Sequence, residues 1–291
     1  GLTRRQPEVH QRHREQARRG ASSQIGHYLL PMLAQRGARV RAVSRDPRAD
    51  TPAATWLRGS LPDAVPQAAE DAQALACFAP MDALAAWLAR GPLPALRRVV
   101  ATSSMSALSK RDSPVAAERA LAQRLRDAEA ALAAACQRRG IAWTILRPTL
   151  IYGAGMDRNL TPLARRALRW RWFALPRGRG LRQPVHAQDV ALAVFAALQT
   201  DAAAGRVVPV GGGERLTAAQ MFARVRASLP VRTVPLPLPR FAVAAGRRLV
   251  PALQGPLSRL DSDLVADNTD LERLLAVHPR GFAPDRRCWG M

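Results

Sequence analysis

Short apolar runs alternate with amphipathic helical patterns from residue 20 onward, and this alternation limits the folds that the chain can adopt. Short strands that are each followed by a helix are typical of a parallel sheet covered by crossover helices. The pattern predicts helices at 24–37, 81–91, 112–140, 187–198 and 217–229. It predicts strands at 38–45, 53–61, 72–80, 96–104, 141–153 and 205–212. The expected fold class is therefore α/β, with a Rossmann-type, doubly wound parallel sheet.

The longest predicted helix spans 112–140 and carries its own start and stop signals. Asp112 or Ser113 can cap its N-terminus, Pro114 suits the first turn, and Gly140 ends it. Within this helix one apolar stripe repeats at helical spacing and is expected to pack in the core. The stripe consists of Leu121, Leu125, Ala128 and Leu132.

The character of the sequence changes after Gly153, where a basic helical pattern and a loop rich in proline, glycine and arginine follow. The segment 234–240 alternates prolines with apolar residues, so we expect it to be extended and to connect or pack as polyproline. These changes predict three parts. They are an atypical polar arm at 1–19, a Rossmann domain at 20–153 and a small C-terminal lobe at 154–291, of which 183–212 return to the sheet.

The segment GASSQIG at 20–26 has the pattern of the glycine turn of a dinucleotide site. Glycines are needed there because the backbone turns sharply and approaches a pyrophosphate at the helix N-terminus. The next strand ends in Ser44 and Arg45, which suit the 2′-phosphate of NADP; NAD is the alternative. The cofactor-binding residues predicted in this way are Gly20, Ser22, Ser23, Gln24, Ile25, Gly26, Ser44 and Arg45.

The residues before this turn do not fit the same pattern. In this fold the first strand is central and buried on both faces, so it should be a nearly continuous apolar run. Residues 3–19 contain only Val9 and Ala17 as apolar residues, which suits a polar helix or a disordered arm. We therefore expect the first strand to be missing or replaced, and cofactor affinity to be reduced. The two explanations are a shifted reading frame or mis-set start upstream of Gly20, and a genuine N-terminal replacement.

Four segments in order resemble the short-chain dehydrogenase/reductase superfamily, and more narrowly the NAD(P)-dependent epimerase/dehydratase family of its extended and atypical branches. They are GASSQIG at 20–26, RRVVATSS at 97–104, ILRPTLIYG at 145–153 and GLRQPVHAQDVA at 180–191. The resemblance implies a nucleotide-sugar substrate held by the C-terminal lobe. It also implies that Ser104 orients the substrate and that Pro148 lies beside the nicotinamide. Arg182, with His186 after it, is then expected to bind the substrate diphosphate.

The family's proton-transfer pair is absent from its usual place. The resemblance implies a tyrosine, and four residues later a lysine that lowers its pKa, on the long helix. Counting back from Glu129 places Leu121 and Leu125 there, and neither can take a proton. Tyr152 and Lys110 are the candidate catalytic substitutes, together with the strand-end serine. The chain is therefore expected to be an atypical NAD(P)-dependent oxidoreductase or, alternatively, a non-catalytic NAD(P)-binding sensor or assembly protein.

The charge of the chain narrows the choice of partners. A net charge of +22 is typical of nucleic-acid binding. However, among the 44 basic residues only Lys110 is lysine, a skew typical of GC-rich coding, and the arginines are spread along the chain. We therefore expect a small-molecule partner with a nucleotide diphosphate rather than nucleic acid, and a homodimer is an open alternative.

The stretch 165–182 is unusually basic and contains Trp170, Trp172 and Phe173 among its arginines. The arginines suit a nucleotide diphosphate, or they form the solvated face of an amphipathic helix. RNA recognition by arginine and stacked rings fits less well.

The sequence bears on cellular location and metal binding only through features that are absent from it. No apolar run reaches the length that crosses a bilayer. Cys77, Cys136 and Cys288 are widely separated and have no ligand spacing. We therefore expect no metal, no membrane partner and a cytoplasmic protein.

Overall fold

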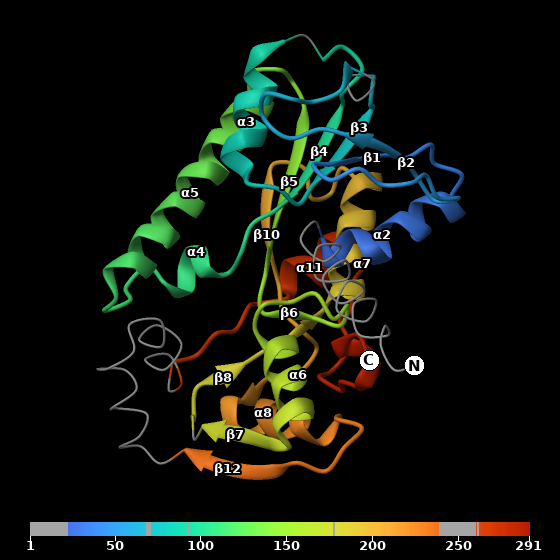
Figure 1. Cartoon of the computed structure of the whole chain (residues 1–291). Coiled ribbons are helices and arrows are strands. Elements are labelled where there is room, and N and C mark those ends of the chain that lie inside the picture. The colour runs from blue at the N-terminus through green and yellow to red at the C-terminus, as the bar shows by residue number, and fades with distance from the viewer. Residues whose placement is uncertain (1–22, 68–70, 92, 177, 239–259, 261) are drawn as a thin grey trace, which may run out of the picture.

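The structure is a computed structural model and describes residues 23–67, 71–91, 93–176, 178–238, 260 and 262–291. The described residues form a helix-covered sheet and a smaller lobe beyond one end of its strands (Figure 1). The predicted arm at 1–19 lies outside the described residues, as do Gly20 and Ser22 of the glycine turn.

Four parallel strands form the central sheet in the order β10–β5–β4–β3. Their bounds are β3 Ala74–Cys77, β4 Arg98–Thr102, β5 Ala142–Pro148 and β10 Arg206–Val210. β4 and β5 are the inner strands, and most of their side chains are buried, as unbroken apolar runs predict for a parallel sheet. The predicted α/β class and parallel pairing are confirmed.

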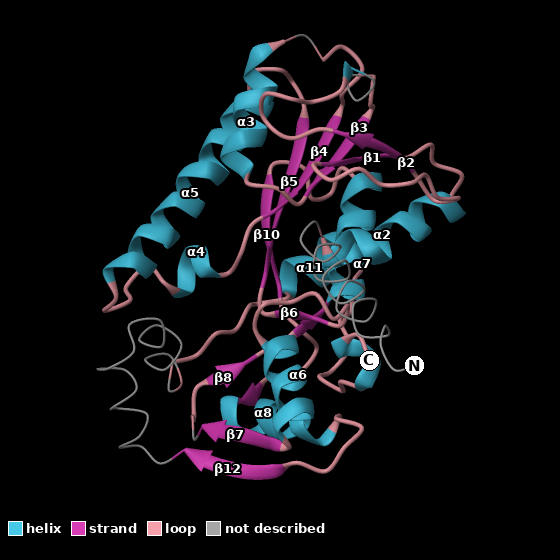
Figure 2. Ribbon diagram, in the orientation of Figure 1, coloured by secondary structure: helices cyan, strands magenta, loops and turns pink. Residues whose placement is uncertain are grey.

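Helices cover both faces of this sheet (Figure 2). On one face α3 Met81–Arg90 packs against α5 Ala116–Gln137, with Leu84, Leu88 and Leu132 buried in their shared core. On the other face α2 Gln24–Gln35 packs against α7 Ala187–Gln199, and α11 Thr269–Leu275 contacts α7 and β10. The last part of the chain therefore returns to the sheet instead of belonging wholly to the lobe.

A separate parallel pair consists of β1 Arg41–Ser44 and β2 Thr55–Arg58. Within the described residues, no strand joins this pair to the central sheet. In a doubly wound sheet, the strand before the glycine turn lies between the positions that β1 and β3 occupy here. That strand would fall before residue 23, so the expectation that it is missing or replaced stays a prediction.

The lobe has its own apolar core, in which Phe173, Met221, Phe282 and Trp289 are buried. The pair formed by β6 Ile151–Tyr152 and β9 Val185–His186 connects it to the sheet domain. The other lobe elements are α6 Leu160–Trp170, β7 Trp172–Pro176, β8 Leu181–Arg182, β11 Leu216–Thr217, α8 Ala218–Ala227, β12 Val234–Leu238 and the 3₁₀ helix η2 Arg286–Trp289.

The expected extended conformation of the proline-rich segment is confirmed for residues 234–238, but the segment pairs as a strand instead of connecting or packing as polyproline. β12 pairs in parallel with β7 along its whole length. The N–H of Val234 donates to the carbonyl of Arg171 at 2.8 Å. Because alternate residues of a strand face opposite sides, Pro235 and Pro237 fall where β7 needs no N–H donor. Alternating prolines are thus compatible with an edge strand.

The long helix begins later than its capping signals suggest. α5 starts at Ala116 after Val115, so neither Asp112 nor Ser113 is its N-cap. The proline that follows Ser113 disfavours helical backbone there. Instead, the Ser113 hydroxyl accepts the N–H of Val115 at 3.2 Å and donates to the Glu118 carboxylate at 2.7 Å.

Candidate functional site

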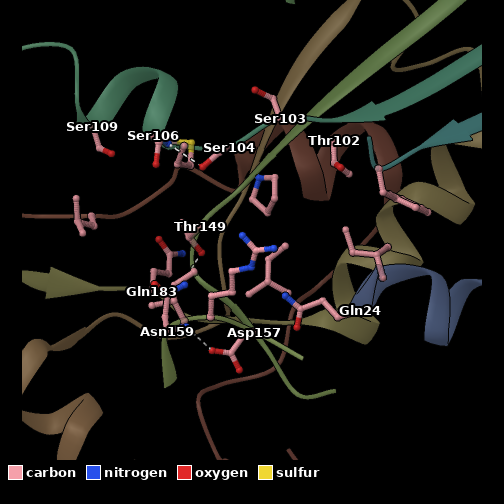
Figure 3. A pocket seen from close by; sticks show the side chains of 18 of the residues that line it. Gln24, Thr102, Ser103, Ser104, Ser106, Ser109, Thr149, Asp157, Asn159 and Gln183 are labelled. Carbon is pink, nitrogen blue, oxygen red and sulfur yellow. Dashed lines mark hydrogen bonds between the residues drawn. The ribbon is translucent and has the colours of Figure 1, made fainter. Parts of the chain in front are cut away.

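A cavity of about 600 Å³ lies at the carboxyl ends of β4 and β5, where open α/β sheets bind their ligands. The N-terminus of α2, the short helix α4 Ser106–Ser109, the loops after β5 and before α6, and strand β8 build its wall (Figure 3). Hydroxyl and amide groups dominate the polar lining, and three cations join them. Of the predicted site residues it brings together Ser23, Gln24, Ile25, Ser104, Lys110, Pro148 and Arg182.

The start of α2 is organised for a tight approach to a ligand. The Ser23 hydroxyl accepts the N–H of Gly26 at 2.7 Å and caps the helix. A Cβ on Gly26 would lie 3.3 Å from this hydroxyl oxygen, so a larger residue would force a shift. The N–H groups of Gln24 and Ile25 belong to the first turn, whose donors lack acceptors within the helix and suit a phosphate. This geometry fits the predicted pyrophosphate turn.

Gln24 supplies an independent indication that this wall holds a ligand. Its Oε1 is buried, and the described residues offer it no hydrogen-bond partner. Buried acceptors of this kind are rare and call for a donor. The amide and the ribose hydroxyls of a nicotinamide dinucleotide carry such donors, so the residues present fit this cofactor.

The residues predicted to select NADP lie at the end of β1. Ser44 is buried there, and Arg45 follows it in an exposed position. Neither lines the cavity as the structure describes it. Their assignment to the 2′-phosphate stays a prediction.

The two serines at the end of β4 have different surroundings. The Ser103 hydroxyl donates to the buried carboxylate of Glu129 and points away from the other labelled side chains in Figure 3. Arg147 on β5 donates hydrogen bonds to the same carboxylate from Nε, at 2.9 Å, and from Nη2. The Ser104 hydroxyl accepts the N–H of Ser106 at 3.1 Å, which leaves its own proton for a ligand. The predicted substrate-orienting role therefore fits Ser104 and not Ser103.

Lys110 lines the cavity from the turn after α4. Its ammonium lies 3.8 Å from the buried carboxylate of Glu118, and the Ser113 hydroxyl donates to the same residue. Leu121 and Leu125, which occupy the family's tyrosine and lysine positions, are half-buried and do not line the cavity. Lys110 is thus the lysine that reaches the site.

The structure argues against the predicted catalytic role of Tyr152. The side chain is 1 % exposed, does not line the cavity, and packs edge-on against His186 and Phe282 at ring distances of 5.2 and 4.9 Å. Burial is the main cause that raises the pKa of its phenol above the ordinary 10.0. A general base needs the opposite shift. Tyr152 is corrected to a packing residue because its strand turns the ring into the lobe core.

His186 also lies away from the cavity wall. Its Nδ1 accepts the N–H of Gln188 at 3.1 Å and caps α7. A Cβ on Gly153 would lie 2.3 Å from Nε2, so the ring fills the space beside that glycine. Burial, and then the positive charge of Arg280, lower the pKa of His186. This placement corrects the predicted substrate contact to a structural role.

Arg182 lines the cavity from the lobe side, as the sequence predicts. Its guanidinium is buried, and Nη1 donates to the carbonyls of Leu181 and Ser262 at 2.9 and 2.8 Å. Arg158 adds an exposed cation to the same wall.

Two residues that hold the cavity wall in place, Asp157 and Gln183, were not predicted from the sequence. The Asp157 carboxylate accepts the N–H groups of Asn159, Leu160 and Thr161, and so fixes the start of α6. Gln183 is buried and bridges the carbonyl of Gly212 and the N–H of Ala266. An acid just before a helical pattern is a capping signal that could have identified Asp157. A glutamine within a motif gives no such signal.

The fold and the start of α2 define a dinucleotide-binding α/β protein. The chain belongs to a family described as NAD(P)H-binding, whose sequence model matches residues 20–201. No curated protein sequence matches the chain significantly.

Solved structures of sugar-nucleotide enzymes share this fold. MoeE5 in complex with UDP-glucuronic acid and NAD has a TM-score of 0.66 at 19% identity, over 90% of this chain and 92% of that one. The UDP-N-acetylglucosamine 4-epimerase from Bacillus cereus has 0.66 at 14%, over 93% and 91%. TunA, an NAD-dependent NDP-hexosamine 5,6-dehydratase involved in tunicamycin biosynthesis, has 0.67 at 19%, over 93% and 95%. The epimerase/dehydratase-like Rossmann architecture is confirmed.

Three further features concern the described residues: membrane-spanning helices, metal-type clusters and reactive thiols. None of the helices found there could traverse a lipid bilayer. No three side chains of His, Cys, Asp or Glu are grouped there to hold a metal ion. All three cysteines are buried free thiols, and burial raises the pKa of Cys77 and Cys136 to about 11.

Removal of the Glu129 carboxylate is expected to destabilise the site strongly. Glu129→Ala leaves the largely buried Arg147 without its charge partner, and the loss of one partner of a buried pair typically costs about 3–5 kcal/mol. Urea unfolding should show this loss, whereas the double variant Glu129→Leu, Arg147→Met should recover much of it. A loss below about 1 kcal/mol in the single variant would contradict the importance of this ion pair.

Stability is expected to fall as the pH drops below about 6.5, the ordinary pKa of histidine. The pKa of His186 is lower in the folded chain, so the unfolded chain binds the proton first. His186 contributes its full share above pH 6.5, and the slope below it stays under the one-proton limit of about 1.4 kcal/mol per pH unit. Unfolding of His186→Asn, which keeps a capping acceptor, should show a shallower slope. The exposed His278→Asn is the control, and equal slopes for all three proteins would refute the assignment.

Proposed function

We propose that this protein is an NADP-dependent oxidoreductase of the epimerase/dehydratase type, acting on a carbonyl or hydroxyl group of a nucleotide-sugar-like substrate. One observation carries this proposal. The N-terminus of α2, the Ser104 hydroxyl and the Arg182 guanidinium converge on one cavity from three separate parts of the chain.

The cofactor would occupy the sheet side of the cavity. Residues 23–26 would hold its pyrophosphate, Pro148 would lie beside the nicotinamide, and Arg45 would pair with the 2′-phosphate. When bound, the cofactor supplies or accepts a hydride. The side chains of the protein itself bind and orient the substrate and transfer the proton.

The lobe side suits a diphosphate. Lys110, Arg158 and Arg182 bring three positive charges to the wall. The Asp157 carboxylate, held by main-chain N–H groups, offsets one of these charges, and Glu118 pairs with Lys110, so the wall keeps a smaller excess of positive charge, carried by the two arginines. Arginine forks match phosphate oxygens in pairs. A nucleotide diphosphate therefore fits this side of the cavity better than an uncharged sugar.

Proton transfer falls to Ser104 and Lys110. The Ser104 hydroxyl has a proton to donate, and orients the substrate oxygen through it. The Lys110 ammonium gives its proton to that oxygen during reduction and takes it back during oxidation. The Glu118 carboxylate beside it keeps the side chain in place.

A second candidate function is non-catalytic NAD(P) binding, as in a sensor or assembly protein. Leucines at positions 121 and 125 and the buried ring of Tyr152 favour it, because they remove the family's proton-transfer pair. The two candidates differ in one property, which is turnover.

Arg45→Ala is expected to weaken NADPH binding at least tenfold and to leave NADH binding unchanged. The change removes a charge-assisted hydrogen bond worth about 1.5–3 kcal/mol. Calorimetric titration of both cofactors measures the effect. Arg48→Ala is the matched control, because its guanidinium lies over the Trp56 ring at 4.6 Å. Equal losses in both variants would count against Arg45.

Lys110→Met is expected to lower turnover about 10²–10⁴-fold, the usual contribution of a general acid. The assay follows deuterium from labelled NADPH into a panel of UDP- and dTDP-linked sugars. Cofactor binding should survive, since Lys110 lies on the turn after α4 and not on the N-terminus of α2 that is proposed to hold the pyrophosphate. Arg111→Met, which removes the adjacent exposed cation, is the control. NADPH binding without deuterium transfer to any sugar would refute the oxidoreductase and leave the second candidate.

A further inference from the structure

An exposed apolar surface lies at the end of the lobe that is farthest from the central sheet (Figure 1). We call it the lobe face, and it consists of Trp170, Trp172, Val234 and Leu236. Their exposed fractions are 50, 40, 66 and 47%. None of them lines the cavity, so the proposed oxidoreductase leaves this surface unexplained.

The pairing of β7 with β12 brings these side chains together. Val234 is opposite Trp172, and the next outward pair is Leu236 and Ala174. Phe173, between the outward residues of β7, is buried in the lobe core. Paired residues of parallel strands share a face, so the apolar side chains form one continuous patch. The Trp170 ring extends it by stacking on Trp172 at 5.6 Å and 17°.

Positive charge surrounds the patch without acidic residues among its neighbours in sequence. Arg166 and Arg169 are exposed on α6, Arg171 lies between the two tryptophans, and Arg232 precedes β12. Residues 158–182 and 226–238, which supply the whole lobe face, contain no aspartate or glutamate. Exposed apolar and indole side chains with arginines close in sequence complement an anionic lipid surface.

The same features disfavour the other partners. The indoles already stack on each other, and the aliphatic Val234 and Leu236 give no ring for a nucleobase. Pro235 and Pro237 have no N–H, so the outer side of β12 offers no donors for an added strand. Acyl chains need only apolar area, and docking of this kind needs no spanning helix.

We propose that the lobe face docks this protein on the surface of an anionic phospholipid membrane. The apolar side chains enter the headgroup boundary, and the four arginines pair with lipid phosphates.

Sedimentation of the full chain with vesicles tests this proposal. Vesicles of two parts phosphatidylcholine and one part phosphatidylglycerol should bind the protein, and pure phosphatidylcholine should bind it much more weakly. Val234→Thr with Leu236→Thr should weaken binding about tenfold, because threonine suits an exposed strand but removes apolar area. Arg169→Gln with Arg232→Gln should weaken it about 20- to 30-fold, or roughly fivefold for each charge.

Matched variants elsewhere separate the lobe face from general charge and hydrophobicity. Val43→Thr changes an exposed apolar residue on β1, and Arg124→Gln with Arg138→Gln removes two exposed charges, one on α5 and one just after it. Both controls should bind vesicles within about twofold of the unchanged chain. Equal losses in controls and lobe-face variants, or equal binding to both vesicle types, would overturn the proposal. Absence of vesicle binding would also overturn the proposal. If the unchanged chain instead retained oligouridylate, and the Val234→Thr, Leu236→Thr double variant did not, the partner would be RNA. If the unchanged chain formed a dimer that the double variant lost, the partner would be a second copy of the chain.

Discussion

The parallel pairing of β4 with β5 is the constraint on which the site depends. Parallel strands end at the same edge, so the register from Arg98 opposite Ala142 brings Ser103 and Ser104 beside Pro148 and Thr149. Glu129 then holds both strand ends from α5, through the Ser103 hydroxyl and the Arg147 guanidinium. This buried carboxylate ties the helix to two strands at the rim of the cavity. Ser104, next to Ser103, is therefore placed with the help of an ion pair that does not itself line the cavity.

The fold could be read from the sequence because its signals are local and repeated. Apolar runs in 96–104 and 141–153 are long enough to fill both faces of an inner strand, and they became β4 and β5. The helix at 24–37 became α2 for a similar reason. The pairing of β12 was not predicted, because the sequence of a single segment does not reveal which strand it pairs with. Only the pairing with β7 shows that the prolines fall on the side without donors.

The sequence predicted the residues of the cavity correctly only where the position of a motif in the fold fixes which way its side chains point. Ser104, Lys110 and Arg182 follow strands or turns whose ends must meet, and they reached the cavity. Tyr152 and His186 stand in equally suggestive motifs. However, alternation along the two-residue strands β6 and β9 turns both rings away from the cavity. A shift of one residue reverses the face of a strand, and a motif does not fix that register. Side-chain direction, rather than residue type, separated the residues that lie at the site from those that do not.

The two parts of the molecule meet through contacts that allow little substitution. The Tyr28 hydroxyl on α2 donates to the carbonyl of Gly153 at 2.7 Å, so the cofactor helix is bonded to the loop that enters the lobe. At Gly153, φ is +112° and His186 fills the space of a Cβ; at Gly155, φ is +64° and the backbone of Gly290 does so. Both conformations favour glycine, and a Cβ at either position would collide with the group that fills its space. The loop continues directly into residues 156–159 of the cavity wall. Because α2, the start of α7 and residue Gly290 all approach this loop, the position of the lobe cations relative to α2 is set by backbone packing. A cavity built in this way has its charges arranged before a ligand arrives, which is the condition under which electrostatic recognition costs least.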